Sequence, residues 1–325
     1  MFTLFSLDVF SVYMRTIQFV RYWTRLPAFQ RIAYASGFVI MLTGIAHLMA
    51  FPLINDATWS GPTGFRKSIV FGLSGGFTLV TLSWLLSYFP AKPKLHTSMM
   101  VGMSATMIIE IIIIDLQRHR GVYSHFNMAT PLDSVLWSIM GISILSFALL
   151  ATIQTILSFG KLKASPAMKI AIRLSMLVFF LSQISGQLIV IHGLSVVFQE
   201  GQFIYENIAK STTFGEGGNL KLPHALSLHA IQVIPLLGLT LNRIELKNTP
   251  SKLLIWINAV GFLGLVVLAQ VQAYKGKLIH QLDTFSAVIA WGCLFLLLVP
   301  NIYASVTFVT GKILNQGPAK NRIEI

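Results

Sequence analysis

Charged residues are scarce in this 325-residue chain, where Asp, Glu, Lys and Arg together make up 11% of the sequence. A soluble domain carries about 25% of such residues, so the deficit points away from the soluble class. Cysteine is scarcer still, because Cys293 is the single one. That count excludes an intrachain disulfide, a cysteine-rich zinc site and the covalent attachment of a c-type haem.

Several sequence signatures of catalysis are also missing. The chain has no Walker loop, dinucleotide-binding glycine fingerprint, serine nucleophile elbow or H-E-x-x-H pattern. The missing Walker loop argues against ATP-driven transport by this chain alone. The net charge is +13, but the basic residues lie in short connections and tails beside apolar segments. This distribution is typical of membrane topology and headgroup contact, so we expect no nucleic-acid partner.

The chain does have long apolar segments, which recur eight times. A helix rises 1.5 Å per residue, so roughly 20 apolar residues cross about 30 Å of hydrocarbon. We therefore predict an all-α fold, a polytopic membrane bundle of eight transmembrane helices with the lipid bilayer as its first partner. The predicted spans are residues 32–54, 68–89, 97–115, 134–158, 170–194, 225–242, 253–273 and 281–305.

The basic residues give this bundle an orientation. Two thirds of the 24 Lys and Arg residues fall on the side that holds both chain ends, and the positive-inside rule places that side in the cytoplasm. We expect a cytoplasmic or interfacial amphipathic segment over residues 1–30, a membrane domain over 31–306 and a cytoplasmic tail over 307–325. The outward connections are longer, and the longest covers residues 195–224.

Four ionisable residues fall inside the predicted spans: Glu110, His47, His192 and His229. Such a group at membrane depth costs roughly 2.5 to 3.5 kcal/mol even on the permissive insertion scale, which makes each one a functional candidate. The competing interpretation is an internally hydrogen-bonded packing residue. Under the predicted topology these residues lie toward the outer side, as do most of the other histidines and acidic residues.

The outer end of the third span carries a second group of polar residues. Asp115 and His119 are four residues apart and would pair on one helical face, where a carboxylate fixes the imidazole tautomer. An ion-pair cluster with Arg118 and Arg120 is the alternative. His125 follows in a turn-like stretch and is expected to fold back over the same face. The candidate proton-transfer or catalytic residues are thus Glu110, Asp115, His119 and His125.

Histidines are also candidate cofactor ligands. His224 and His229 are five residues apart, about 140° around a helix, so a regular helix cannot direct both at one ion. His229 could instead act with His47 or His192 from neighbouring helices as a ligand of haem b or of a divalent metal. The cofactor-binding candidates are His47, His192, His224 and His229.

The connection before the second span ends in two basic residues. Arg66 and Lys67 fall at the start of a helix, where backbone N–H groups also favour anions. One hypothesis is a clamp for a phosphate or carboxylate group. The other is that the two side chains extend toward lipid headgroups.

Three stretches together resemble a family of uncharacterised bacterial integral membrane proteins. They are Gly61-Pro62 with Arg66-Lys67 and Phe71-Gly72, then Gln117 to Asn127, then His224 to Gly238. The resemblance runs from about the first span through the sixth. It implies a membrane-embedded helical fold in the bacterial cytoplasmic membrane, and it carries no known activity.

Three functional hypotheses follow. The first is a non-covalent haem or metal centre for membrane redox chemistry, with a quinone or another small molecule as ligand, and it requires two histidines to converge on facing helices. The second is a proton-coupled transporter or permease, in which Glu110 and the histidines titrate and an enclosed path passes Gln183 and Gln187. The third is a lipid-binding or assembly-factor role, with Arg66 and Lys67 on phosphate groups.

Overall fold

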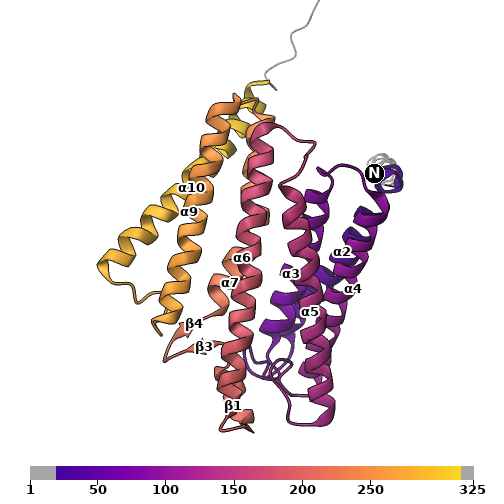
Figure 1. Ribbon diagram of the computed structural model, residues 1–325, viewed down its shortest axis with the longest axis vertical. Helices are drawn as coiled ribbons and strands as arrows, with labels where there is room; N and C mark the ends of the chain where they lie inside the picture. The colour runs from indigo at the N-terminus through magenta and orange to yellow at the C-terminus, as the bar shows by residue number, and fades with distance from the viewer. Residues whose placement is uncertain (1–19, 316–325) are drawn as a thin grey trace, which may run out of the picture.

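The computed structural model describes residues 20–315 of the chain. These residues form an all-α bundle in which eight segments are long and apolar enough to cross a membrane (Figure 1). The protein is therefore a multi-pass membrane protein, and the predicted fold class and number of spans are confirmed. Most of the predicted amphipathic segment, and the end of the predicted tail, lie outside the described residues.

Five of the helices, namely α4, α5, α6, α9 and α10, are longer than the apolar segments that predicted them. α4, α5 and α6 begin at Pro93, Pro131 and Pro166, because proline is suited to the first turn of a helix. α4 continues through polar residues to His119, and hydropathy alone does not register such an extension. The helices are α2 (Ala28–Ala50) with the short η1 (Phe51–Leu53), α3 (Phe65–Leu86), α4 (Pro93–His119), α5 (Pro131–Ser158), α6 (Pro166–Val197), α7 (Lys221–Leu228), α8 (Ala230–Arg243), α9 (Asn248–Tyr274) and α10 (Thr284–Asn315).

The sixth span is broken in its middle. α7 ends and α8 begins at His229, whose backbone caps both helices. α8 also contains Pro235, which removes one helical hydrogen bond. The predicted sixth span is still one apolar segment, Lys221–Arg243, with this interruption at His229.

Two small hairpins and a 3-10 helix form most of the long connection between α6 and α7. β1 (Phe198–Gln199) pairs with β2 (Gln202–Phe203), and β3 (Thr213–Phe214) pairs with β4 (Gly218–Asn219), both antiparallel. η2 (Tyr205–Lys210) lies between them. We call this end of the bundle, which also holds the connections 54–64, 120–130 and 275–283, the hairpin end (lower end in Figure 1).

The helices pack as two halves. α2 to α5 contact mainly one another, α6 to α10 do the same, and the main contacts between halves are α5 with α6 and α3 with α8. The tightest pair is α2 with α3, where glycines let the backbones touch. A Cβ added to Gly37 would lie 2.7 Å from the carbonyl oxygen of Gly76. Small residues permit such close approach between membrane helices.

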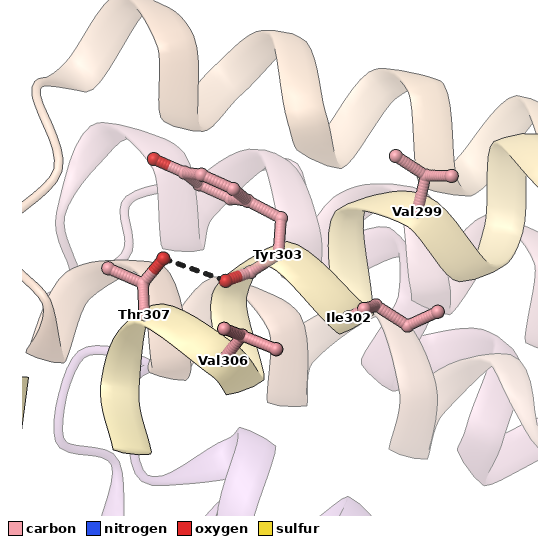
Figure 2. Close-up of a pocket in the computed structure, with 5 residues that line it drawn as sticks. All are labelled: Val299, Ile302, Tyr303, Val306 and Thr307. Atoms are coloured by element: carbon pink, nitrogen blue, oxygen red, sulfur yellow. Dashed lines mark hydrogen bonds between the residues drawn. The ribbon is translucent and has the colours of Figure 1, made fainter. Parts of the chain in front are cut away.

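α10 forms one edge of the bundle and is the least buried span (Figure 1). It packs against α9, where Gly261 and Gly264 leave room for Cys293 and its neighbours. Its outer surface carries an apolar groove of about 310 Å³, and Figure 2 shows its lining residues: Val299, Ile302, Tyr303, Val306 and Thr307. None of the predicted site residues lines this groove, and its apolar character fits a surface that faces lipid.

Candidate functional site

A chain of four polar side chains links three elements at the hairpin end. Lys67 Nζ, in the first turn of α3, donates to Ser124 Oγ at 2.8 Å. Ser124 Oγ lies 3.3 Å from His125 Nδ1, and both residues belong to the connection between α4 and α5. His125 Nε2 in turn lies 3.3 Å from Glu110 Oε1 of α4. The structure thus brings predicted candidates from three stretches of sequence into one contiguous group.

The donors and acceptors available fix the direction of the hydrogen bonds from Lys67 to Glu110. A lysine ammonium group only donates, so Ser124 Oγ accepts from Lys67 and its own hydroxyl proton is free to reach His125 Nδ1. An imidazole that accepts at Nδ1 carries its proton at Nε2, from which it donates to Glu110. This assignment leaves a cation at one end of the chain and a carboxylate at the other. Moving one proton along it would neutralise both ends.

Glu110 is the most deeply buried member that carries charge. Its residue exposure is 4%, and its Oε2 atom is buried without a hydrogen-bond partner. An unsatisfied buried oxygen in a native structure needs an explanation, such as a proton, a water or a ligand. Glu110 therefore has one oxygen on His125 and one available for a further group.

Burial lowers the pKa of His125, and the positive charge of Lys67 lowers it further, while Glu110 opposes both effects. The ring is flanked by Phe71, with 5.8 Å between ring centroids, and by Trp137, with 5.5 Å. These aromatic side chains remove water from the imidazole, which disfavours its charged form. The pKa direction agrees with the neutral His125 assigned from the hydrogen bonds.

The backbone beside His125 is strained. Phe126 has a φ of +58°, which is rare for a bulky residue. Its ring packs against Gly193 of α6, where no Cβ would fit, and against Trp137 at 4.8 Å between centroids. Asn127 holds the turn by donating to the carbonyl of Tyr123. The side chain after His125 thus anchors the connection to the second half of the bundle.

A second histidine–carboxylate contact lies nearby, between α2 and α4. His47 Nε2 is 3.7 Å from Asp115 Oδ1, and its Nδ1 lies 2.8 Å from the carbonyl oxygen of Thr43. The expected pairing of the Asp115 carboxylate with His119 is wrong. His119 is exposed and contacts the backbone carbonyl of Asp115 at 2.7 Å, because this carbonyl lies one turn back on the same helix.

The structure adds a polar network that the sequence did not single out. Asp133, at the start of α5, accepts from Arg120 at 2.7 Å and from Gln117 at 2.9 Å. Thr130 caps α5 and also donates to Asp133 at 2.6 Å. Every oxygen of this buried carboxylate is therefore engaged by protein groups. A structural role in fixing the 120–130 connection follows, and the spacing from Thr130 to Asp133 was the available signal.

The four cofactor-ligand candidates are spread over the bundle. His192 Nε2 lies 2.9 Å from the Thr213 carbonyl, and His224 Nδ1 lies 2.8 Å from the Ser182 carbonyl. Within residues 20–315, no hydrogen bond, ion pair or ring contact joins any two of the histidines 47, 192 and 229. The part of the chain that is described also contains no cluster of three or more His, Cys, Asp or Glu side chains suited to a metal ion.

Some polar residues inside the second half connect helices. Ser185 of α6 donates to Gln270 of α9 at 3.2 Å. Gln232 of α8 donates to Thr81 of α3 at 3.3 Å and lies 3.3 Å from His229. Polar side chains that bridge helices in this way stabilise helix packing in membranes. Gln187, where the transporter hypothesis placed part of an enclosed path, is exposed on the surface of α6.

Three basic residues near helix starts at the hairpin end influence one another electrostatically. Arg66 and Lys67 lie in the first turn of α3, and Lys221 begins α7 in the other half. The charges of Arg66 and Lys221 both act on Lys67, and that of Arg66 acts on Lys221. The sequence predicted Arg66 and Lys67 as candidates but not Lys221, because no sequence pattern relates residue 221 to residue 66.

The order serine, histidine, carboxylate is also that of a nucleophile, its base and an orienting acid. Two observations argue against this role for Ser124. Its residue exposure is 6%, and Lys67 donates a hydrogen bond to the hydroxyl oxygen that would have to attack. Donation to a hydroxyl oxygen withdraws electron density from it. The geometry therefore favours proton transfer over nucleophilic attack.

No protein-family model matches this chain, and no curated protein or solved structure is significantly similar to it.

Proposed function

We propose that this protein is a proton-coupled permease of the bacterial cytoplasmic membrane, and that Glu110 and His125 bind and release the coupled proton. The observation that carries the proposal is the chain from Lys67 through Ser124 and His125 to Glu110. Each contact is within reach of proton transfer, and the carboxylate at its end has an unpartnered oxygen inside a membrane helix.

The remaining sequence features support this setting. The excess of basic residues at the end opposite the hairpins favours a cytoplasmic location for that end. The hairpin end, with the four linked side chains from Lys67 to Glu110, would then face outward. The resemblance to bacterial membrane proteins favours the bacterial cytoplasmic membrane. The redox hypothesis has less support, because the histidines it needs as shared ligands make separate contacts.

The test is proton flux in liposomes that contain the purified protein and the pH dye pyranine. A potassium gradient with valinomycin sets the membrane potential, and a panel of solutes is added outside: inorganic phosphate, acetate, glycerol and ammonium. We expect at least one solute to change the internal pH. Glu110→Gln should abolish the change, because an amide cannot release a proton at this position.

The matched control is Glu206→Gln, which removes an exposed carboxylate on the connection between α6 and α7. It should transport at the wild-type rate. Proton flux that persists unchanged in Glu110→Gln, or the absence of flux with every solute of the panel, would overturn the proposal. Size-exclusion chromatography shows whether each variant keeps its fold.

A further inference from the structure

Two histidines at the hairpin end carry a proton on the same ring nitrogen. His47 Nδ1 lies 2.8 Å from the backbone carbonyl oxygen of Thr43, and His119 Nδ1 lies 2.7 Å from that of Asp115. A carbonyl oxygen only accepts hydrogen bonds, so Nδ1 must be the donor in both rings. In the neutral form of either ring, Nε2 then has no proton and is an acceptor.

The groups that face these two Nε2 atoms differ. His119 Nε2 lies 3.3 Å from Nη2 of Arg118, which is a donor, so this acceptor has a complementary neighbour. His47 Nε2 lies 3.7 Å from Oδ1 of Asp115, and Oδ1 is buried without a hydrogen-bond partner. An ionised carboxylate only accepts. A neutral His47 and an ionised Asp115 would therefore place two acceptors face to face between α2 and α4.

A proton between the two atoms removes this conflict. A bridging water would need about 2.8 Å to each atom and would hold them more than about 4 Å apart, so it does not fit a gap of 3.7 Å. Within residues 20–315, no third His, Cys, Asp or Glu side chain completes a metal site here. A proton on Nε2 converts the contact into a charge-assisted donor–acceptor pair, which favours closer approach.

We propose that His47 and Asp115 form a second proton-binding site, in which the proton resides on His47 Nε2 and is directed at Asp115 Oδ1. Asp115 and Glu110 are five residues apart on α4, about 140° around the helix, so the two carboxylates serve different faces. The site is therefore separate from the chain that ends at Glu110, and when occupied it joins α2 to α4. Its existence rests on this geometry, whereas a role for its proton in transport rests on the proposed function.

The surrounding charges favour the proton on the imidazole. Arg118 is three residues beyond Asp115 on α4, and its positive charge favours the ionised carboxylate. The same charge disfavours an imidazolium, and the carboxylate 3.7 Å from Nε2 offsets it. The Phe65 ring flanks both cations, at 4.2 Å from the guanidinium and 6.1 Å from the imidazole centroid. The remaining charged or titratable groups near this end of the helices packed against α2 are Arg66 and Lys67 of α3 and Glu110 and His119 of α4.

The test is a pH titration of the full-length protein in an uncharged detergent, followed by heteronuclear NMR of the histidine ring nitrogens. His47→Asn identifies the His47 signals by their loss. We expect Nδ1 of His47 to remain protonated throughout, and Nε2 to gain its proton as the pH falls. Asp115→Asn should keep the fold, because its amide can donate to the bare Nε2. It should lower the proton affinity of His47 by about tenfold or more, since it removes the adjacent negative charge.

The matched control is Asp56→Asn, which removes an exposed carboxylate from the connection 54–64 at the same end. It should leave the proton affinity of His47 unchanged, because water and salt screen an exposed charge. A neutral His47 that carries its proton on Nε2, or equal proton affinities in wild type and Asp115→Asn, would overturn the site. The expected titration without any solute-driven proton flux would leave the site standing and remove the permease function.

Discussion

The Nε2 atom of His125 lies 3.3 Å from Oε1 of Glu110, so a residue of a connection reaches a carboxylate inside a membrane-spanning helix. This contact closes the chain that begins at Lys67. It also contains a pH-sensitive group, because burial lowers the pKa of His125.

We predict that stability falls as the pH is lowered through the region below 6.5. The folded protein holds His125 with a pKa below its ordinary value of 6.5, whereas the unfolded chain restores that value. The unfolded state therefore binds more protons between the two values, and protonation favours unfolding there. The positive charge of Lys67 lowers the pKa of His125 further, and Glu110 opposes this shift. Thermal unfolding in detergent, recorded from pH 5 to pH 8, measures this dependence.

His125→Gln should flatten that pH dependence, since glutamine does not titrate. The control is His280→Gln, because His280 is exposed near the start of α10. It should retain the wild-type curve. A wild-type midpoint that is constant below pH 6.5 would contradict the burial of a neutral imidazole at residue 125.

Gly37→Ala should destabilise the protein by separating α2 from α3. The added methyl group would meet the carbonyl oxygen of Gly76 at 2.7 Å and the side chain of Val80 at 2.8 Å. Backbone cannot move aside cheaply, so a loss of about 1–3 kcal/mol is expected. Gly141→Ala is the matched control, because a Cβ there meets nothing within 4 Å. Unfolding in mixed micelles compares the two, and equal effects would refute the close approach.

Asp133→Ala should loosen the connection that carries His125. It removes the shared acceptor of Arg120, Gln117 and Thr130, and Arg120 keeps only Gln117 Oε1 as a side-chain acceptor. Because Arg120 is partly exposed, we expect a loss of about 1–3 kcal/mol, below that of a fully buried pair. Limited proteolysis should cut between α4 and α5 faster than in wild type. Glu206→Ala, which removes an exposed carboxylate, should not change the cleavage rate.

The orientation of the bundle can be tested with single cysteines. Cys293→Ser provides a cysteine-free background, because the chain has no other cysteine. Gln202→Cys lies on the hairpin end and Lys161→Cys on the opposite end, and both positions are exposed. We expect a membrane-impermeant maleimide to label residue 202 in intact bacterial cells and residue 161 only after lysis. The reverse pattern would place the hairpin end in the cytoplasm.

Hydropathy predicted the eight spans because span length follows from bilayer thickness alone. It did not predict that α4 runs to His119, or that the sixth span breaks at His229, because both depend on local backbone contacts. Glu110 and His125 were both recognised as candidates from their residue types and positions. Their contact, and the link to Lys67 through Ser124, could not be predicted because both depend on how the connection after α4 folds back. Lys221 was missed for the same reason, since its neighbours are distant in sequence.

The glycine contact between α2 and α3 has a mechanical consequence. Because the backbones of α2 and α3 are in contact at Gly37 and Gly76, we expect these two helices to move together as one unit. Lys67 lies in the first turn of α3, and Lys221 begins α7 in the other half. A rotation of one half against the other would therefore carry α2 together with α3 and shift Lys67 relative to Lys221.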